Sequence, residues 1–259
     1  MSHSGSLFQI QSQKGEKSTS VSAVQQQTPV FSQSAPMLLR STLECPLLID
    51  SEQRAAAEYF AVLRARLLKA CDKSGFRSVL ISSPQQRDGK TFTSINLALS
   101  LAQLEQVRVL LVDGDMRVKG TTAGLRLESE IGLADYLQQC AAYEDCVRAT
   151  SLSHLQIVPA GNVLGESLPG ILQGALWHDF MERSKQTFDL VIVDSVPATA
   201  PIADFELLLN ACEAALLVVH VRKTRRAAIE SVGDRMQGKL LGVILNNQDL
   251  QENFSYGDS

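Results

Sequence analysis

Three consecutive residues, Gly89, Lys90 and Thr91, have the groups that bind nucleotide phosphates, and they lie in the stretch LISSPQQRDGKTFTSINLALSLA. A lysine ammonium reaches the β- and γ-phosphates, a threonine hydroxyl binds magnesium, and glycine lets the backbone approach phosphate without a Cβ atom. The apolar run before them predicts a strand, and the spacing after them predicts a helix whose N-terminus favours an anion. This order predicts a phosphate-binding loop. We expect the loop to contact nucleotide through Gln86, Arg87, Asp88, Gly89, Lys90, Thr91 and Phe92.

Two positions in this loop differ from the usual pattern, G-x-x-x-x-G-K-[ST]. Pro84 takes the place of the first glycine, which is tolerable if the chain only turns there. Arg87 lies inside the loop, and its side chain must point either to solvent or to phosphate. The sequence leaves both orientations of Arg87 open.

Acidic residues follow two further apolar runs. Asp113 and Asp115 end the run VLLVDGDMR, and Asp194 ends the run FDLVIVD. Ligands of an open parallel sheet bind at the carboxyl edge of its strands, and residues i and i+2 of an extended chain point the same way. One such aspartate is equally consistent with a solvated turn, but three of them beside Lys90 and Thr91 predict a Mg·ATP site.

The last apolar run, LLGVILNN, ends in Asn246 and Asn247. The amide of Asn246 has the paired donor and acceptor that an adenine ring needs, so we include it among the candidate nucleotide contacts. The same residue is equally consistent with a turn.

Short, continuously apolar runs alternate with stretches of helical spacing along the chain. The runs are RSVLISS, VRVLLVDGD, FDLVIVD, AALLVVHV and LLGVILN. This alternation predicts an α/β fold of the P-loop NTPase type, with a mostly parallel sheet and helices on both faces. Residues 51–74 precede the first strand and predict a helix with Ser51 as N-cap. Its apolar stripe is Phe60, Leu63, Leu67 and Cys71.

The ends of the chain differ from its centre in composition. Residues 1–47 are rich in Ser and Gln and have few large apolar residues, so they predict a disordered tail. Residues 48–249 form the predicted P-loop domain, and the polar residues 250–259 a flexible C-terminal tail. The net charge of −4 gives no reason to expect nucleic acid as a partner, and no apolar run approaches the roughly 20 residues of a membrane span. Five scattered cysteines suit reduced thiols, so we expect a cytoplasmic protein.

The motifs together resemble those of the cytoplasmic domain of bacterial tyrosine kinases (BY-kinases), the capsular and exopolysaccharide autokinases of the P-loop class. The resemblance runs from about Glu58 to Asn247. ISSPQQRDGKTFTSINLALSLAQ resembles the Walker A loop and its helix, VLLVDGDMR the second Walker motif with paired aspartates, and FDLVIVDSVPATAPIAD the Walker B segment. The resemblance implies ATP-dependent tyrosine phosphorylation, by rings of subunits, that controls polysaccharide assembly at the membrane.

The resemblance also implies a role for each site residue. Lys90 would bind the β- and γ-phosphates, and Thr91 and Asp113 would hold Mg²⁺. Asp194 would position the water of that metal shell, and Asp115 would act near the tyrosine hydroxyl as a base or metal partner. The activator would be a separate membrane polysaccharide co-polymerase, which would recruit the kinase to the inner face of the membrane.

Several residues depart from the family pattern. Arg87 replaces the usual loop glycine, Ala61 replaces an arginine of the oligomerisation helix, and Val196 replaces the first of two prolines. The tail offers Tyr256 alone as the autophosphorylation candidate, where the family has a tyrosine cluster. Two alternatives therefore stay open. One is a catalytically weakened nucleotide-binding scaffold; the other is a partitioning-type ATPase switch, which Gln85 disfavours because those proteins have a lysine at that position.

Overall fold

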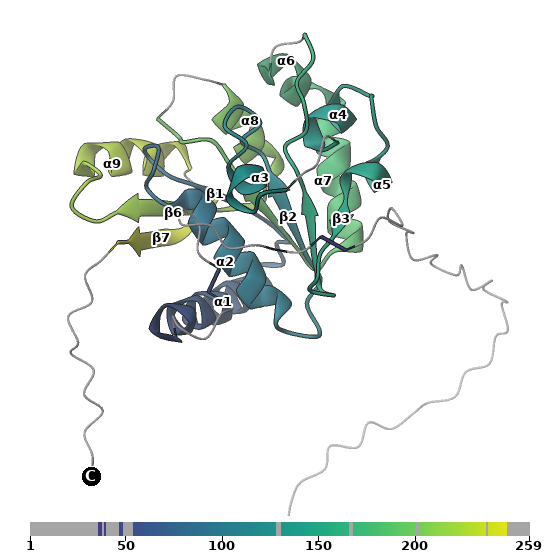
Figure 1. Ribbon diagram of the computed structural model, residues 1–259. Coiled ribbons are helices and arrows are strands. Elements are labelled where there is room, and N and C mark those ends of the chain that lie inside the picture. Colours follow the sequence, from purple (N-terminus) through teal and green to yellow (C-terminus); the bar gives the residue numbers. More distant parts are fainter. Residues whose placement is uncertain are drawn as a thin grey trace, which may run out of the picture.

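The computed structural model describes residues 36, 37, 39, 47, 48, 54–127, 131–165, 168–199, 203–236 and 238–247. Among these residues seven strands form one sheet in the order β3-β4-β2-β5-β1-β6-β7 (Figure 1). All neighbouring strands pair in parallel except β3 and β4, which pair antiparallel. The strands are β1 (Ser78–Ser82), β2 (Val109–Asp113), β3 (Arg148–Ala149), β4 (Leu155–Val158), β5 (Leu190–Asp194), β6 (Ala214–His220) and β7 (Leu240–Asn246).

Helices cover both faces of this sheet (Figure 1). The long helix α1 packs against α2, and α6, α7 and α8 pack together on the opposite face. Within the described residues no helix combines the length and the apolar character needed to cross a bilayer. The helices are α1 (Arg54–Ser74), α2 (Lys90–Ala102), α3 (Gly120–Gly124), α4 (Leu133–Leu137), α5 (Tyr143–Cys146), α6 (Leu168–Gln173), α7 (Ala175–Thr187), α8 (Asp204–Ala211) and α9 (Arg226–Arg235).

The central strands are buried on both faces, which explains why their sequences show no alternation. In β1, Leu80 points into the core under α7 and α8, whereas Val79 and Ile81 point into the core under α1 and α2. The predicted P-loop α/β fold, with a mostly parallel sheet and helices on both faces, is confirmed.

The apolar stripe of α1 holds this helix against the domain. Leu67 is buried in the core, and Phe60, Leu63 and Cys71 pack against it, as predicted. The ring of Phe60 meets the ring of Phe92 edge to face, with 5.8 Å between the centroids. Because Phe92 lies in the first turn of α2, α1 supports the helix that begins at the phosphate loop.

The structure differs from the predicted tail at the few described residues before position 48. Met37 bridges to β3, donating its N–H to the carbonyl of Ala149 and accepting the N–H of Ser151, both at 2.9 Å. Leu47 is buried beside α2, and Leu39 packs against the same core. The Ser/Gln-rich average of residues 1–47 hides these apolar side chains, which bury surface on the domain. The rest of that predicted tail, Ser51 as N-cap, and residues 250–259 lie outside the described residues.

Candidate nucleotide site

The loop between β1 and α2 is folded around its own buried carboxylate. The Oδ2 atom of Asp88 accepts the N–H of Gln85 at 2.9 Å, and the Asp88 side chain has no exposed surface. The Nδ2 atom of Asn246, at the end of β7, donates to the carbonyl of Asp88 at 3.0 Å. Gly89 has φ 101°, and a Cβ atom there would lie 1.9 Å from Asn246 Nδ2. The left-handed backbone therefore favours glycine at this position, and a larger residue would also displace the Asn246 amide from the loop.

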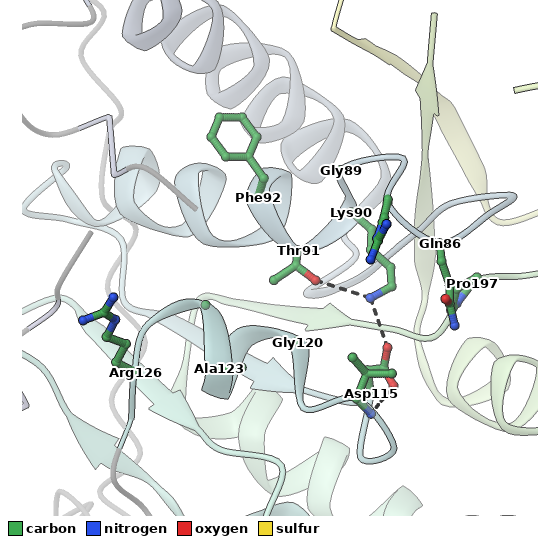
Figure 2. Close-up of a pocket in the computed structure, with 13 residues that line it drawn as sticks. Gln86, Gly89, Lys90, Thr91, Phe92, Asp115, Gly120, Ala123, Arg126 and Pro197 are labelled. Atoms are coloured by element: carbon green, nitrogen blue, oxygen red, sulfur yellow. Dashed lines mark hydrogen bonds and ion pairs between the residues drawn. The ribbon is translucent and has the colours of Figure 1, made fainter. Parts of the chain in front are cut away.

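Lys90 begins α2 and points along the carboxyl edge of the sheet (Figure 2). Its Nζ atom lies 3.1 Å from Asp115 Oδ2 and 3.3 Å from Thr91 Oγ1. Burial lowers the pKa of Lys90, but Asp194, Asp115 and Asp113 outweigh it and the pKa is raised. Lys90 is therefore a firmly protonated ammonium at the floor of the site.

Asp113 and Asp194 lie side by side because they are register partners on β2 and β5. Both carboxylates are fully buried. The Oδ2 atom of Asp113 accepts both the N–H and the hydroxyl of Thr122, at 2.8 and 2.6 Å. Burial first, and then the charge of Asp194, raise the pKa of Asp113 to about 7 despite these bonds.

Asp194 is surrounded by hydroxyl groups. Its Oδ2 atom accepts the hydroxyl of Thr121 at 2.9 Å, and its Oδ1 atom accepts the hydroxyl of Ser94 at 3.2 Å. Thr91 also bonds to this carboxylate. The pKa of Asp194 is raised because burial outweighs the attraction of Lys90 and these hydrogen bonds.

The donor set of the site suits a hard divalent cation. Three carboxylates face one ammonium, so the site has more negative than positive charge, and its available ligand atoms are oxygens, which Mg²⁺ prefers. Within the described residues no three His, Cys, Asp or Glu side chains are grouped to hold a metal on their own. Mg²⁺ characteristically takes one or two carboxylates together with substrate phosphates and water, which fits this arrangement.

A cavity of about 1060 Å³ opens above these groups. Among the predicted site residues, its lining includes Gln86, Arg87, Gly89, Lys90, Thr91, Phe92 and Asp115. Asp88, Asp113 and Asp194 are buried and do not line it, and Asn246 contacts the loop from behind. The structure gives Asn246 a role in holding the loop, and its contact with adenine stays a prediction. Tyr256 lies outside the described residues.

The sequence did not point to several residues that line this cavity. The missed lining residues are Val118, Gly120, Ala123, Gly124, Arg126 and Pro197. Arg126 lies on the side of Thr91 away from Gln86 and Pro197 (Figure 2). Gly120 is packed so closely that a Cβ atom would lie 2.7 Å from Thr91 Oγ1. The available signal was the run KGTTAG, because small and hydroxyl residues soon after an acid-tipped strand can approach and bond its carboxylates.

Comparisons with known proteins agree with this geometry. The profile of the AAA domain family matches residues 81–233. The tyrosine-protein kinase CpsD of Streptococcus agalactiae serotype III (strain NEM316) is 31% identical over 218 residues, covering 82% of this chain and 91% of the relative. The succinoglycan biosynthesis transport protein ExoP of Rhizobium meliloti (strain 1021) is 28% identical over 82% of this chain, but this covers only 27% of ExoP. Among solved structures, the kinase domain of the Escherichia coli tyrosine kinase ETK has the same fold, with a TM-score of 0.72, 23% identity, and coverage of 85% of this chain and 88% of that one.

Proposed function

The chain belongs to the bacterial tyrosine kinase family of P-loop proteins with an AAA domain, and from this premise we propose that it binds Mg·ATP and transfers the γ-phosphoryl group to tyrosine hydroxyls. The observation that supports the proposal most directly is the meeting of Lys90 with the carboxylates of Asp113, Asp115 and Asp194 at one edge of the sheet. Phosphoryl transfer mainly requires positioning and charge neutralisation, which this set of groups can supply.

The residues divide into those that hold phosphate and those that hold the metal. The backbone N–H groups from Gln86 to Phe92, at the N-terminus of α2, would bind the phosphate oxygens together with Lys90. Thr91 and Asp113 would provide ligands to Mg²⁺, and Asp194 would hold a water of its shell. Mg²⁺ would supply positive charge that offsets the repulsion among the crowded carboxylates and the phosphates.

Asp115 is suited to a role at the acceptor hydroxyl. It lines the cavity and is paired with Lys90. Phosphate oxygens would compete for the Lys90 ammonium, and Asp115 would then lose its ion-pair partner. A free carboxylate beside the transferred group can accept the proton of a tyrosine hydroxyl.

We place this activity in polysaccharide synthesis or export, because CpsD and ExoP have related domains and ExoP is named as a succinoglycan biosynthesis transport protein. The expected setting is the cytoplasm, in an oligomer recruited to the inner face of the membrane by a polysaccharide co-polymerase. Tyr256 is the candidate acceptor in the chain's own tail.

The experiment is to incubate the purified chain with Mg·ATP, with and without membranes that contain the co-polymerase, and to locate phosphotyrosine by mass spectrometry. Lys90→Met should abolish the phosphotyrosine and raise the Kd for Mg·ATP about 100-fold, because the buried carboxylates then repel the triphosphate without compensation. Lys223 is an exposed lysine after β6, so Lys223→Met is the matched control. It should change neither the phosphotyrosine signal nor the Kd for Mg·ATP.

Two outcomes would contradict the proposal. Unchanged Mg·ATP affinity in Lys90→Met would remove the site assignment. Tight Mg·ATP binding without phosphotyrosine, with or without the partner, would favour the nucleotide-binding scaffold instead.

A further inference from the structure

Arg87 has a backbone conformation that an arginine rarely adopts. Its φ is 66°, in the left-handed region where a Cβ atom is crowded and glycine is the usual residue. Arg87 stands two residues before Gly89, inside the phosphate loop. A strained conformation of this kind persists only where the surrounding structure imposes it, and such residues gather at functional sites.

No internal contact explains this conformation. Across the described part of the chain, no hydrogen bond or ion pair involves the Arg87 side chain. The neighbouring carboxylate of Asp88 is turned inward to the N–H of Gln85, so it does not pair with the guanidinium. The Arg87 side chain is exposed and lines the same cavity as Lys90 and Asp115.

The floor of the site leaves a need for further positive charge, and of the two arginines that line the cavity, Arg87 and Arg126, Arg87 lies in the phosphate loop itself. Lys90 already forms an ion pair with Asp115 and is attracted by Asp113 and Asp194. An incoming triphosphate therefore meets a floor where the one ammonium is largely compensated by carboxylates. The Arg87 guanidinium lines the cavity from the phosphate loop itself and pairs with no carboxylate among the described residues, and its planar fork binds phosphate oxygens in pairs.

We propose that the Arg87 guanidinium binds the polyphosphate of a nucleoside di- or triphosphate, and that the left-handed backbone at residue 87 is retained because it places this cation on the cavity wall. The inference rests on the proposed function, since it names a further binding residue of the same site. The inference predicts that glycine at position 87 raises the stability of the protein, because the backbone strain is relieved. It also predicts that glycine lowers the affinity for nucleotide, because the cation is lost.

The test is Arg87→Gly, examined by thermal unfolding without nucleotide and by calorimetric titration with Mg·ATP and Mg·ADP at several salt concentrations. Relief of the left-handed strain should raise Tm by about 2 °C. The loss of a charge-assisted contact should raise both Kd values about tenfold and make them less dependent on salt. Arg87→Lys keeps the charge without the planar fork and should fall between the wild type and Arg87→Gly.

The matched control is Arg222→Gly. Arg222 follows β6, has φ 68°, and is not among the lining residues of the cavity. Its replacement should leave the affinity for both nucleotides unchanged.

Nucleotide affinity in Arg87→Gly equal to or tighter than in the wild type would overturn the inference, and so would an equal loss in Arg222→Gly. Either result leaves the proposed function intact as long as Lys90→Met still loses Mg·ATP. Unchanged binding in Lys90→Met would instead overturn the proposed function itself.

Discussion

Two regions of the molecule use buried side chains for opposite purposes. The aromatic cluster, made of Tyr136, Tyr143, Trp177 and Phe180, lies under α4, α5 and α7. Its rings lie 5.2 to 6.3 Å apart between centroids, and its buried polar groups are bonded: Tyr143 Oη lies 3.1 Å from Ser184 Oγ, and Trp177 Nε1 donates to the carbonyl of Leu207. Every contact there favours the folded state without a ligand.

The carboxyl edge of β1, β2 and β5 is different. There the chain buries Asp113 and Asp194 beside each other with raised pKa values, and the loop after β1 holds Arg87 in a left-handed conformation. Each feature costs stability in the empty protein. The aromatic cluster therefore stabilises the fold without a ligand, whereas the nucleotide site keeps groups that are unfavourable until a ligand binds.

The largest expected effect comes from removing the centre of the aromatic cluster. Phe180 has no exposed surface and contacts the other three rings. Phe180→Ala should lower the free energy of unfolding by about 3–5 kcal/mol, measured by urea denaturation, because it leaves a cavity. The affinity of the folded fraction for Mg·ATP should stay unchanged. Leu241→Ala, at an exposed position of β7, is the control and should cost far less.

A drop of more than tenfold in the affinity of folded Phe180→Ala would show that the two regions are coupled. The aromatic cluster would then contribute to nucleotide binding as well as to stability.

A smaller effect is expected from Asp113→Asn in the empty protein, and it depends on pH. The folded pKa of Asp113, about 7, is above its ordinary value of 3.8, so the folded state binds this proton more tightly and loses stability as pH rises through this range. Between pH 5.5 and pH 8 the free energy of unfolding of the wild type should therefore fall by about 2 kcal/mol relative to that of Asp113→Asn. Urea unfolding of both proteins at the two pH values measures the difference. The same substitution should weaken Mg·ATP binding.

Asp189→Asn is the control for this pH dependence. Asp189 lies just before β5, at the opposite end of the sheet. There, hydrogen bonds from Arg108 outweigh partial burial and lower the pKa of Asp189. It is ionised throughout pH 5.5–8, so the stability difference from wild type should not change with pH. If the stability difference from wild type changed equally with pH for Asp113→Asn and Asp189→Asn, the pH dependence would not come from Asp113.

The smallest expected effect comes from removing the contact between β7 and the phosphate loop. Asn246→Ala removes the 3.0 Å hydrogen bond to the carbonyl of Asp88, worth about 1 kcal/mol, and should weaken Mg·ATP binding by about fivefold. Asn247→Gly preserves the left-handed backbone of the next residue and should leave binding unchanged, as isothermal titration can show. Equal affinities in Asn246→Ala and wild type would mean that the loop keeps its shape without this bond.

Much of this architecture could be predicted from sequence. The five apolar runs became β1, β2, β5, β6 and β7. The first four are buried almost throughout, and strands buried on both faces must be apolar. The edge strand β7 is apolar too, although alternate residues of it are exposed. The edge strand β3 and its neighbour β4 were not predicted as strands. β3 is two residues long and gives no periodic signal, and β4 has only four residues.

The sequence could predict those site residues whose side chains have one dominant chemistry, such as a lysine for phosphate or an aspartate for a metal ion. Lys90, Asp113 and Asp194 follow strand ends, so the fold alone brings them together. The partners Thr121 and Thr122 could not be placed, because their position depends on the path of the chain after Asp115 and on the short helix α3. The same holds for Arg126, whose place on the cavity wall follows from the turn after α3 rather than from a motif.

The contact between Asn246 and the loop has a consequence for synthesis on the ribosome. A nascent chain that has emerged only to residue 235 already contains the lysine, the threonine and all three acidic residues of the site. It still lacks β7, whose terminal side-chain amide donates to the carbonyl that precedes the loop glycine. Full competence to hold nucleotide should therefore arise only after β7 has been made, which would keep chains that lack this strand from binding ATP at full strength.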